Sequence, residues 1–438
     1  MSLAFPTQVG CSRLARLKWP GAAFALLLCL PFVFLFTRLP PPQEIPVPCL
    51  TRVTIGSAAH FVHVCDSYSM SQEMANLEHF FTVANPWRGR PVYIVGGAML
   101  AAALSPAAGL VRAALNGHVG GSADWHVLLR RFPAYLAMVV INFLVLALAL
   151  WMALRLTGTQ DRLLAFALGA AIATSDMVHG MFWTQHSNFV NLLIPIGGIF
   201  YFVAGCRARQ MRLFAVTGFG LAAALALLTY TYAVVWLPAF VLGALYRDLR
   251  MGLSRGAIAE LVPRLALFAA ASCLPMLAWL ALNWFYLHVT VAYEAVTLRQ
   301  FAWLADAWAD GALGAALAAH WHGYLAAVWE WLGWPAPLIL VAAAVLLVAG
   351  WRRWELARLA LDPILVAAAV TTVCMLSFNF VQGFYQPRLT AGILLALFIV
   401  FARLAQLTAR PAWGAAALLA VSAGQIVAAF LWPPIAIS

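Results

Sequence analysis

The chain has 438 residues, of which 64% are hydrophobic and only 9% are charged, and its mean hydropathy is +0.89. Because a soluble fold of this length needs more polar surface, the composition excludes a soluble globular protein. The net charge of +11 does not indicate nucleic-acid binding, since the basic residues lie in short groups between apolar runs. The sequence therefore predicts an all-α polytopic membrane protein.

Apolar runs that could cross a bilayer recur along the whole chain. The first run, 19–37, follows Arg13, Arg16 and Lys18 as a signal peptide would, but it is longer than a signal peptide's apolar region and no small-residue cleavage site follows. We therefore interpret it as a membrane span and treat 1–438 as a single transmembrane domain without a separate soluble C-terminal domain. With roughly 20 residues needed for each crossing, about eleven spans are expected, at 19–37, 132–154, 163–180, 189–205, 213–229, 232–246, 265–287, 333–350, 363–380, 389–405 and 412–432.

The apolar segment 91–115 is interrupted by Ser105, Pro106 and Arg112. If it does not cross the membrane, the arginine-rich connectors collect on one side; if it does, every later basic loop lies on the opposite side. The positive-inside rule favours the first arrangement. We therefore expect 91–115 to lie in the membrane interface, within one long outer loop, 38–131.

The same topology places 174–188, 288–332 and 380–389 on the outer side. The segments 213–229 and 232–246 leave almost no turn between them, and either two spans or a re-entrant hairpin satisfies the charge rule. We expect a multi-pass protein of a bacterial inner membrane, with its polar segments facing the periplasm.

Within the outer loop, the stretch 63–81, HVCDSYSMSQEMANLEHFF, is unusually polar, with three carboxylates and two histidines. A helical repeat of apolar residues predicts an amphipathic helix whose apolar stripe lies on the membrane. Ser69 and Gln72 fit a capping box at its start. The residues of the stripe are Met70, Met74, Leu77 and Phe81.

Asp66 precedes this expected helix, and two interpretations remain open. As an N-cap or turn residue, Asp66 would only stabilise local structure. As a partly desolvated carboxylate beside the membrane, it could instead act as a general base.

Two other outer segments carry histidines. Asp176 and His179 are three residues apart and share a face if the helix extends that far, with His186 beyond. They could hold a divalent metal ion or a sugar hydroxyl, or they could simply form a polar helix end. The sequence HWHGY at 320–324 favours anchoring in the interface over a metal site.

Cys49 and Cys65 both lie in the outer loop, which is oxidising in a periplasm. A disulfide between them would stiffen the approach to Asp66, and two free thiols are the alternative.

Several short motifs resemble those of the C-type glycosyltransferases (GT-C superfamily), which include protein O-mannosyltransferases, lipid A aminoarabinose transferases and mycobacterial arabinosyltransferases. The segments 225–240 and 383–394 resemble later parts of that family. Ser67 stands where relatives carry a second acid, and Tyr230 stands where they often carry Lys. The early matching residues are Asp66, Tyr68, Arg90, Pro91 and Tyr93.

The resemblance implies an inverting transfer of a sugar from a polyprenyl-phosphate donor to a lipid, glycan or protein acceptor at the outer face, without nucleic acid. Asp66 is the implied general base, and Arg388 is the candidate clamp for the leaving phosphate, because a guanidinium matches phosphate oxygens. No cofactor is certain, and Asp176 and His179 are the candidates for a divalent metal. The other candidate substrate-binding residues are Tyr68, Arg90, His186, Tyr230 and Tyr385.

Two other functions remain open. A translocase for lipids or polyprenol-linked glycans is disfavoured, because the expected spans carry no Asp, Glu, Lys or His away from their ends. The protein could also be a non-enzymatic membrane assembly protein, in which case replacing Asp66 would not change its function.

Overall fold

The structure is a computed structural model that describes residues 21–37, 51–55, 59–82, 85–115, 119–121, 130–158, 161–184, 187–252, 255–288, 300–350, 361–383 and 392–432. The α-helices among them are α1 (Gly21–Cys29), α2 (Cys65–Ala75), α3 (Leu77–Thr82), α4 (Pro91–Leu115), α6 (Phe132–Thr157), α7 (Arg162–Ala173), α8 (Asp176–Met181), α9 (Leu193–Gly205), α10 (Leu213–Thr229), α11 (Trp236–Met251), α12 (Arg255–Ala281), α14 (Ala302–Ala309), α15 (Leu313–Leu332), α16 (Pro335–Gly350), α18 (Pro363–Gln382), α20 (Ile393–Leu407) and α21 (Pro411–Leu431). The shorter helical turns used below are η1 (Leu30–Phe36), η2 (Pro86–Gly89), η3 (Ser187–Leu192), η4 (Ala208–Gln210), η5 (Thr231–Val235) and η6 (Leu282–Tyr286).

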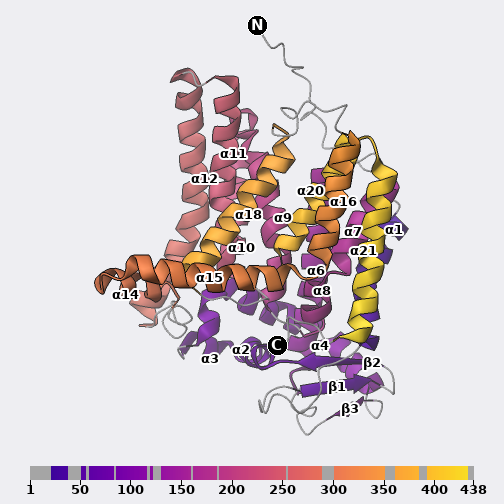
Figure 1. The fold of residues 1–438 in the computed structure, drawn as a ribbon. Coiled ribbons are helices and arrows are strands. Elements are labelled where there is room, and N and C mark those ends of the chain that lie inside the picture. The colour runs from indigo at the N-terminus through magenta and orange to yellow at the C-terminus, as the bar shows by residue number, and fades with distance from the viewer. Residues whose placement is uncertain are drawn as a thin grey trace.

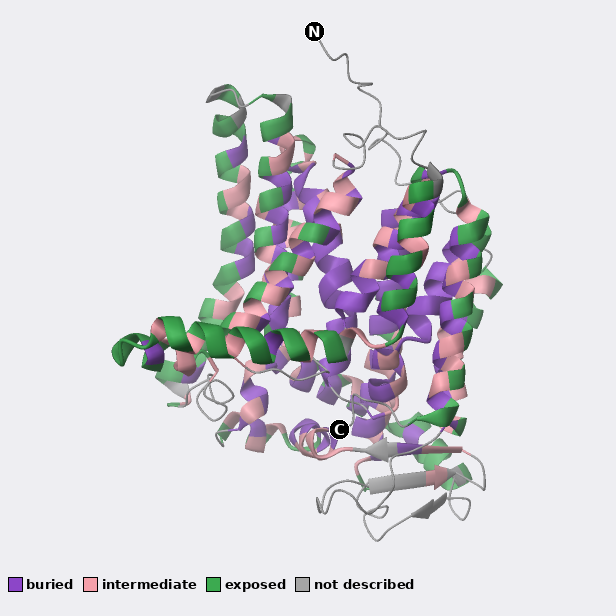
Figure 2. Ribbon diagram, viewed as in Figure 1, coloured by how far each residue is buried: buried purple, intermediate pink, exposed green. Residues whose placement is uncertain are grey.

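Most of these helices run side by side in one bundle (Figure 1). Long apolar segments favour helices because a helix satisfies its own backbone hydrogen bonds in the absence of water. α9 is apolar and buried on nearly all sides, whereas α12 and α16 expose large apolar residues, including Leu274, Leu277, Val341 and Val345 (Figure 2). A bundle with a packed centre and an apolar outer surface is the arrangement of a multi-pass membrane protein.

Fewer of the described helices reach full span length than the eleven crossings expected. In the described part of the chain, seven helices are long and apolar enough to span a membrane, or up to eight if the bent pair α15 and α16 counts as one span. Four further apolar helices, at Gly21–Phe36, Arg162–Ala173, Leu213–Thr229 and Ile393–Leu407, are shorter. All eleven expected spans overlap a described helix.

The bundle has two chemically different ends. We call the end that holds Thr37, Arg90, Ser187, Tyr230 and Gly383 the polar end. Hydrogen bonds and ring contacts connect neighbouring segments there, from Thr37 to His179 and from Arg90 to both Ser187 and Tyr230. The expected outer segments therefore gather at one end of the molecule.

The opposite end, which we call the basic end, is defined by Arg209, Arg247, Arg250 and Arg403. Arg209 of η4 bonds Glu260 of α12 (3.0 Å), and Arg247 of α11 donates to the carbonyl of Cys206 at the end of α9 (3.0 Å). Among the described residues, the arginine-rich connectors around Arg209, Arg247 and Arg403 therefore lie at one end, as the expected topology requires.

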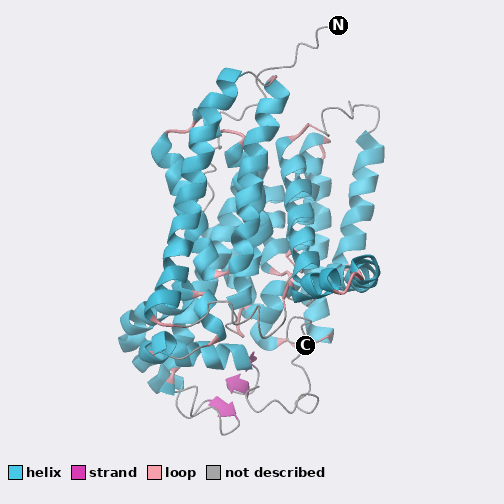
Figure 3. Ribbon diagram, turned by 90° about the vertical axis from the view of Figure 1, so that its left-hand side faces the viewer, coloured by secondary structure: helices cyan, strands magenta, loops and turns pink. Residues whose placement is uncertain are grey.

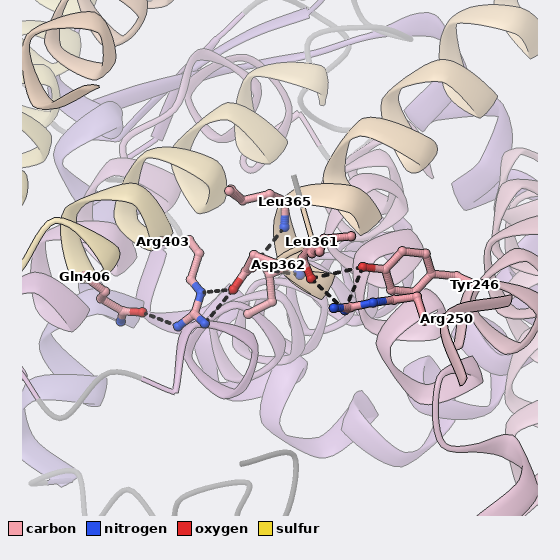
Figure 4. A network of polar contacts seen from close by, with 8 residues as sticks. Tyr246, Arg250, Leu361, Asp362, Leu365, Arg403 and Gln406 are labelled. Atoms are coloured by element: carbon pink, nitrogen blue, oxygen red, sulfur yellow. Dashed lines mark hydrogen bonds and ion pairs between the residues drawn. The ribbon is translucent and has the colours of Figure 1, made fainter. Parts of the chain in front are cut away.

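Asp362 organises a larger polar network at the basic end (Figure 4). Its Oδ1 accepts hydrogen bonds from the backbone N–H groups of Ile364 (3.0 Å) and Leu365 (3.2 Å), so it caps α18, and its Oδ2 accepts from Arg403 (2.7 Å). Arg250 donates to the Leu361 carbonyl at 2.9 Å. Asp362 thus fastens α20 to the start of α18, and the preceding residue Leu361 fastens α11 to it.

Both ends of α4 lie at the polar end. Arg90, immediately before α4, contacts Ser187 and Tyr230, while Ala108 near the other end packs with Phe132 and Tyr135 at the start of α6. Length and composition would allow α4 to cross, but its contacts place it along the end of the bundle, as an interfacial helix would lie.

A small antiparallel sheet, ordered β2-β1-β3, covers part of the polar end (Figure 1). Its strands are β1 (Thr51–Ile55), β2 (Ala59–His63) and β3 (Val119–Gly121), with Thr51 opposite His63 and Val53 opposite Gly121. The sheet was not predicted. The sequence of β1, TRVTI, is rich in β-branched residues, and apolar and polar side chains alternate along it; this pattern is typical of a strand.

Candidate functional site

Asp66 lies in the first turn of α2 and is partly buried. The residue at the N-cap is Val64, so Asp66 does not cap the helix, although a carboxylate in the first turn interacts favourably with the helix dipole. The expected capping box is wrong, because α2 begins at Cys65 and Ser69 lies inside it. Asp66 is thus held on a regular helix instead of in a turn.

The apolar stripe of α2 faces the protein and not the membrane. Met70 is fully buried and Met74 is nearly so, and Gly97 of α4 leaves room for the Met74 thioether. Phe81 of α3 packs edge-on against Trp279 of α12. The stripe therefore docks the helix that carries Asp66 firmly on the bundle.

A chain of contacts leads from α2 to Arg90. Ser69 is three residues after Asp66, on the same side of the helix, and its hydroxyl accepts a hydrogen bond from Trp87 Nε1 at 2.8 Å. The guanidinium of Arg90 lies 5.1 Å from the centre of the Trp87 ring and 5.0 Å from that of Tyr230. Asp66, Arg90 and Tyr230 therefore belong to one neighbourhood.

Arg90 is only 8% exposed and also donates to the Ser187 hydroxyl. Tyr230 is buried as well, and its hydroxyl accepts a hydrogen bond from Asn191 Nδ2 at 3.2 Å. The Arg90 guanidinium is attracted by both aromatic rings and is largely shielded from water. Such a group is suited to attract a phosphate.

Tyr68 and Ser67 fix the same helix to other elements. The guanidinium of Arg131, just before α6, lies 4.5 Å from the centre of the Tyr68 ring. The Ser67 hydroxyl donates to the carbonyl of Thr184. The structure therefore brings 174–184 next to the start of α2.

Beside this neighbourhood is a buried ionic cluster that the sequence analysis did not identify. Glu73 is 3% exposed and both of its oxygens contact His79 Nδ1, at 3.0 and 3.1 Å. Arg88 is 1% exposed and donates to Asn283 Oδ1 at 3.2 Å. Burial lowers the pKa of Arg88, and the Glu73 carboxylate acts in the opposite direction. The only sequence signal was the occurrence of Glu73 and His79 in the acidic stretch.

Asp176 and His179 share a face of α8, with His179 Nδ1 3.8 Å from Asp176 Oδ1. His179 Nε2 lies 3.0 Å from the Thr37 hydroxyl, which itself donates to the Phe34 carbonyl. Nε2 is therefore the donor in this contact and fastens the end of η1. No group of three His, Cys, Asp or Glu side chains suited to a metal occurs within the described ranges.

The two histidines of HWHGY have other contacts. His320 stacks on Trp303, with ring centres 3.9 Å apart, and His322 Nδ1 lies 2.8 Å from the Ala318 carbonyl. These contacts fit an anchoring role better than a metal site.

Some predicted residues lie outside the described residues. They are Cys49, His186, Tyr385 and Arg388. Cys65 forms a disulfide, so it is not the free thiol that one alternative supposed.

Comparisons with known proteins identify no relative. No family model matches the chain, and no significant match was found among curated proteins or among solved structures. The chain is a helical multi-pass membrane protein whose function has to be inferred from its own residues.

Proposed function

We propose that the chain is a membrane glycosyltransferase of the GT-C type. It would move a sugar from a polyprenyl-phosphate donor to a lipid, glycan or protein acceptor at the polar end of the bundle. One observation carries the proposal: the segments around Asp66, Arg90 and Tyr230, which resemble GT-C motifs, are linked by the contacts of Trp87 with Ser69 and of Arg90 with Trp87 and Tyr230.

In this proposal Asp66 is the general base. It removes the proton from an acceptor hydroxyl as that oxygen attacks the anomeric carbon of the donor sugar. The bond from that carbon to the carrier phosphate breaks, and the configuration inverts. The lipid phosphate leaves with the negative charge, which has to be stabilised by a nearby cation.

Two cations are available for that charge. Arg388, three residues after Tyr385 in the sequence, remains the candidate clamp. Arg90 is a second candidate, because its buried guanidinium already lies beside Tyr230. Tyr68 and His186 would contact the substrates, and Asp176 with His179 remains the candidate position for a divalent metal.

The proposal places the active site on the periplasmic face of a bacterial inner membrane. An active site at the end opposite the arginine-rich connectors supports this orientation, because basic loops stay in the cytoplasm. The apolar outer surface of the bundle next to the polar end is suited to a long prenyl chain.

The direct test uses purified protein in liposomes with a panel of polyprenyl-phosphate sugars, each radiolabelled in the sugar, and with extracted envelope lipids and glycans as acceptors. Label that moves from carrier to acceptor supports the proposal. Movement of fluorescent polyprenol-linked glycan across the bilayer without transfer would instead identify a translocase. If the protein shows neither sugar transfer nor translocation with any donor, this result would favour an assembly protein.

A further inference from the structure

Two groups of elements lie at the polar end of the bundle. Figure 1 shows α15 of one group roughly perpendicular to its neighbours, and the view in Figure 3 shows it nearly end-on. The other group carries Asp66 on α2 and Arg90 just before α4, and the turn η2 lies between these two residues in the chain. The contacts of η2 therefore influence how Asp66 and Arg90 are placed relative to each other.

η2 lies along one face of α2. Trp87 Nε1 donates to the Ser69 hydroxyl at 2.8 Å. Burial lowers the pKa of the next residue, Arg88, and the Glu73 carboxylate acts in the opposite direction, so these two charges are close. Asp66, Ser69 and Glu73 are spaced by three and four residues and share a helix face. Two neighbouring residues of η2 thus meet successive turns of the face that carries Asp66.

The same indole supports Arg90. The guanidinium carbon of Arg90 lies over the Trp87 ring, 5.1 Å from its centre, and the backbone N–H of Arg90 donates to the Trp87 carbonyl at 2.8 Å. Trp87 is only 4% exposed, and its own backbone N–H donates to Asn85 Oδ1 at 3.0 Å. A fixed, buried side chain therefore contacts the Asp66 helix with its N–H and the Arg90 cation with its ring.

We propose that Trp87 is a positioning residue that sets the general base and the phosphate-binding cation relative to each other. Its N–H places the Asp66 helix through Ser69, and its ring holds the guanidinium of Arg90. The inference rests on the proposed function of Asp66 and Arg90. Because the two contacts use different parts of one side chain, they predict two separable effects.

The first effect concerns the N–H. Trp87→Phe keeps an aromatic ring beside Arg90 but loses the bond to Ser69, and Ser69→Ala removes the same bond from the other side. Each should lower kcat on the order of tenfold or more, because small misplacements of a catalytic group are costly. The donor KM should stay within about twofold. The double variant should be no slower than the slower single variant, because both changes remove one contact.

The second effect concerns the ring, and its readout is binding without turnover. Trp87→Leu loses the ring as well as the N–H, so the support of Arg90 is lost. The Kd for a sugar-free polyprenyl phosphate, measured at equilibrium in detergent, should rise several-fold in Trp87→Leu. In Trp87→Phe and Ser69→Ala it should stay close to the wild-type value.

Trp236→Phe is the matched control. Trp236 is 5% exposed, and its Nε1 donates to the Ile194 carbonyl at 3.0 Å. The control therefore removes a comparable buried bond that does not connect α2 with Arg90. It should lower the unfolding temperature but leave kcat per folded molecule and the Kd for polyprenyl phosphate unchanged. If Trp87→Phe does not fold, Ser69→Ala carries the kinetic test alone.

Three results would overturn the assignment of Trp87 while leaving the proposed function intact. They are wild-type kcat in folded Ser69→Ala, fully additive losses in the double variant, and an equal loss of kcat in Trp236→Phe. A wild-type protein that transfers sugar from no donor would instead refute the proposed function, and the assignment of Trp87 would fall with it.

Discussion

The guanidinium carbon of Arg90 lies 5.0 Å from the centre of the Tyr230 ring. Tyr230 occupies a position where the resembled family often carries lysine. In this chain the Arg90 guanidinium, from a different segment, places a cation beside the position of Tyr230. Both residues are buried at the polar end, where the Asp66 helix also lies.

The contact predicts a difference between two substitutions of Tyr230. Tyr230→Phe keeps the ring under the guanidinium and loses only the hydroxyl that accepts from Asn191. Tyr230→Leu removes the ring, and the cation–π contribution of about 0.5–2 kcal/mol is lost with it. We expect donor KM to change little for phenylalanine and several-fold for leucine. Equal effects in steady-state assays would mean that the ring does not support Arg90.

A second prediction concerns topology. Single cysteines near Asn188, Gln300 and Gln382 should react with an impermeant maleimide added outside intact cells, because these residues belong to the polar end. Cysteines near Arg209 and Arg353 should react only after permeabilisation. The reverse pattern would place the polar end in the cytoplasm and would rule out a periplasmic donor site.

The sequence predicted the gathering of polar segments because charge asymmetry and span length are properties of whole segments. It also predicted that Asp176 and His179 share a helix face, which the structure confirms. It misplaced the start of α2 because the N-cap is Val64, whose side chain makes no capping bond and leaves no motif. It assigned Met70 to the membrane because periodicity identifies an apolar face without identifying what covers it.

Long-range pairs were beyond sequence reasoning. Nothing in the order of residues connects Arg88 to Asn283 of η6, and only the folded chain brings the two together. The orientation of α15 across the bundle could not be predicted either, because its apolar sequence suits a membrane span as well as a helix that lies flat. His186, Tyr385 and Arg388 stay predictions.

Arg388 is tested by a pair of substitutions. Arg388→Lys keeps the positive charge but loses the planar pair of donors, so it should retain part of the transfer activity. Arg388→Ala should lose nearly all activity while the protein still reaches the membrane in normal amounts. Full activity of the alanine variant would transfer the phosphate-binding role to Arg90, and Arg90→Ala in the same assay is then the next measurement.

The basic end should affect stability without affecting catalysis. Asp362→Ala removes both the cap of α18 and the partner of Arg403, and loss of such a cap alone costs about 0.5–2 kcal/mol. Asp362→Asn keeps a capping oxygen and should be less destabilising. Thermal unfolding in one detergent should rank wild type above asparagine and asparagine above alanine. Activity per folded molecule should be equal in all three, and a specific loss of turnover would show that the two ends are coupled.

The central claim is that Asp66 accepts a proton, and Asp66→Asn tests it most directly. The amide preserves the shape of the side chain and removes its basicity, and loss of a general base typically lowers the rate by about 10² to 10⁴. Because Val64 occupies the N-cap, the change should leave the unfolding temperature nearly unaltered. Purified wild-type and Asp66→Asn proteins should be compared for sugar transfer from the same polyprenyl-phosphate donor. We predict lost turnover at unchanged stability, and near-normal turnover would contradict the account.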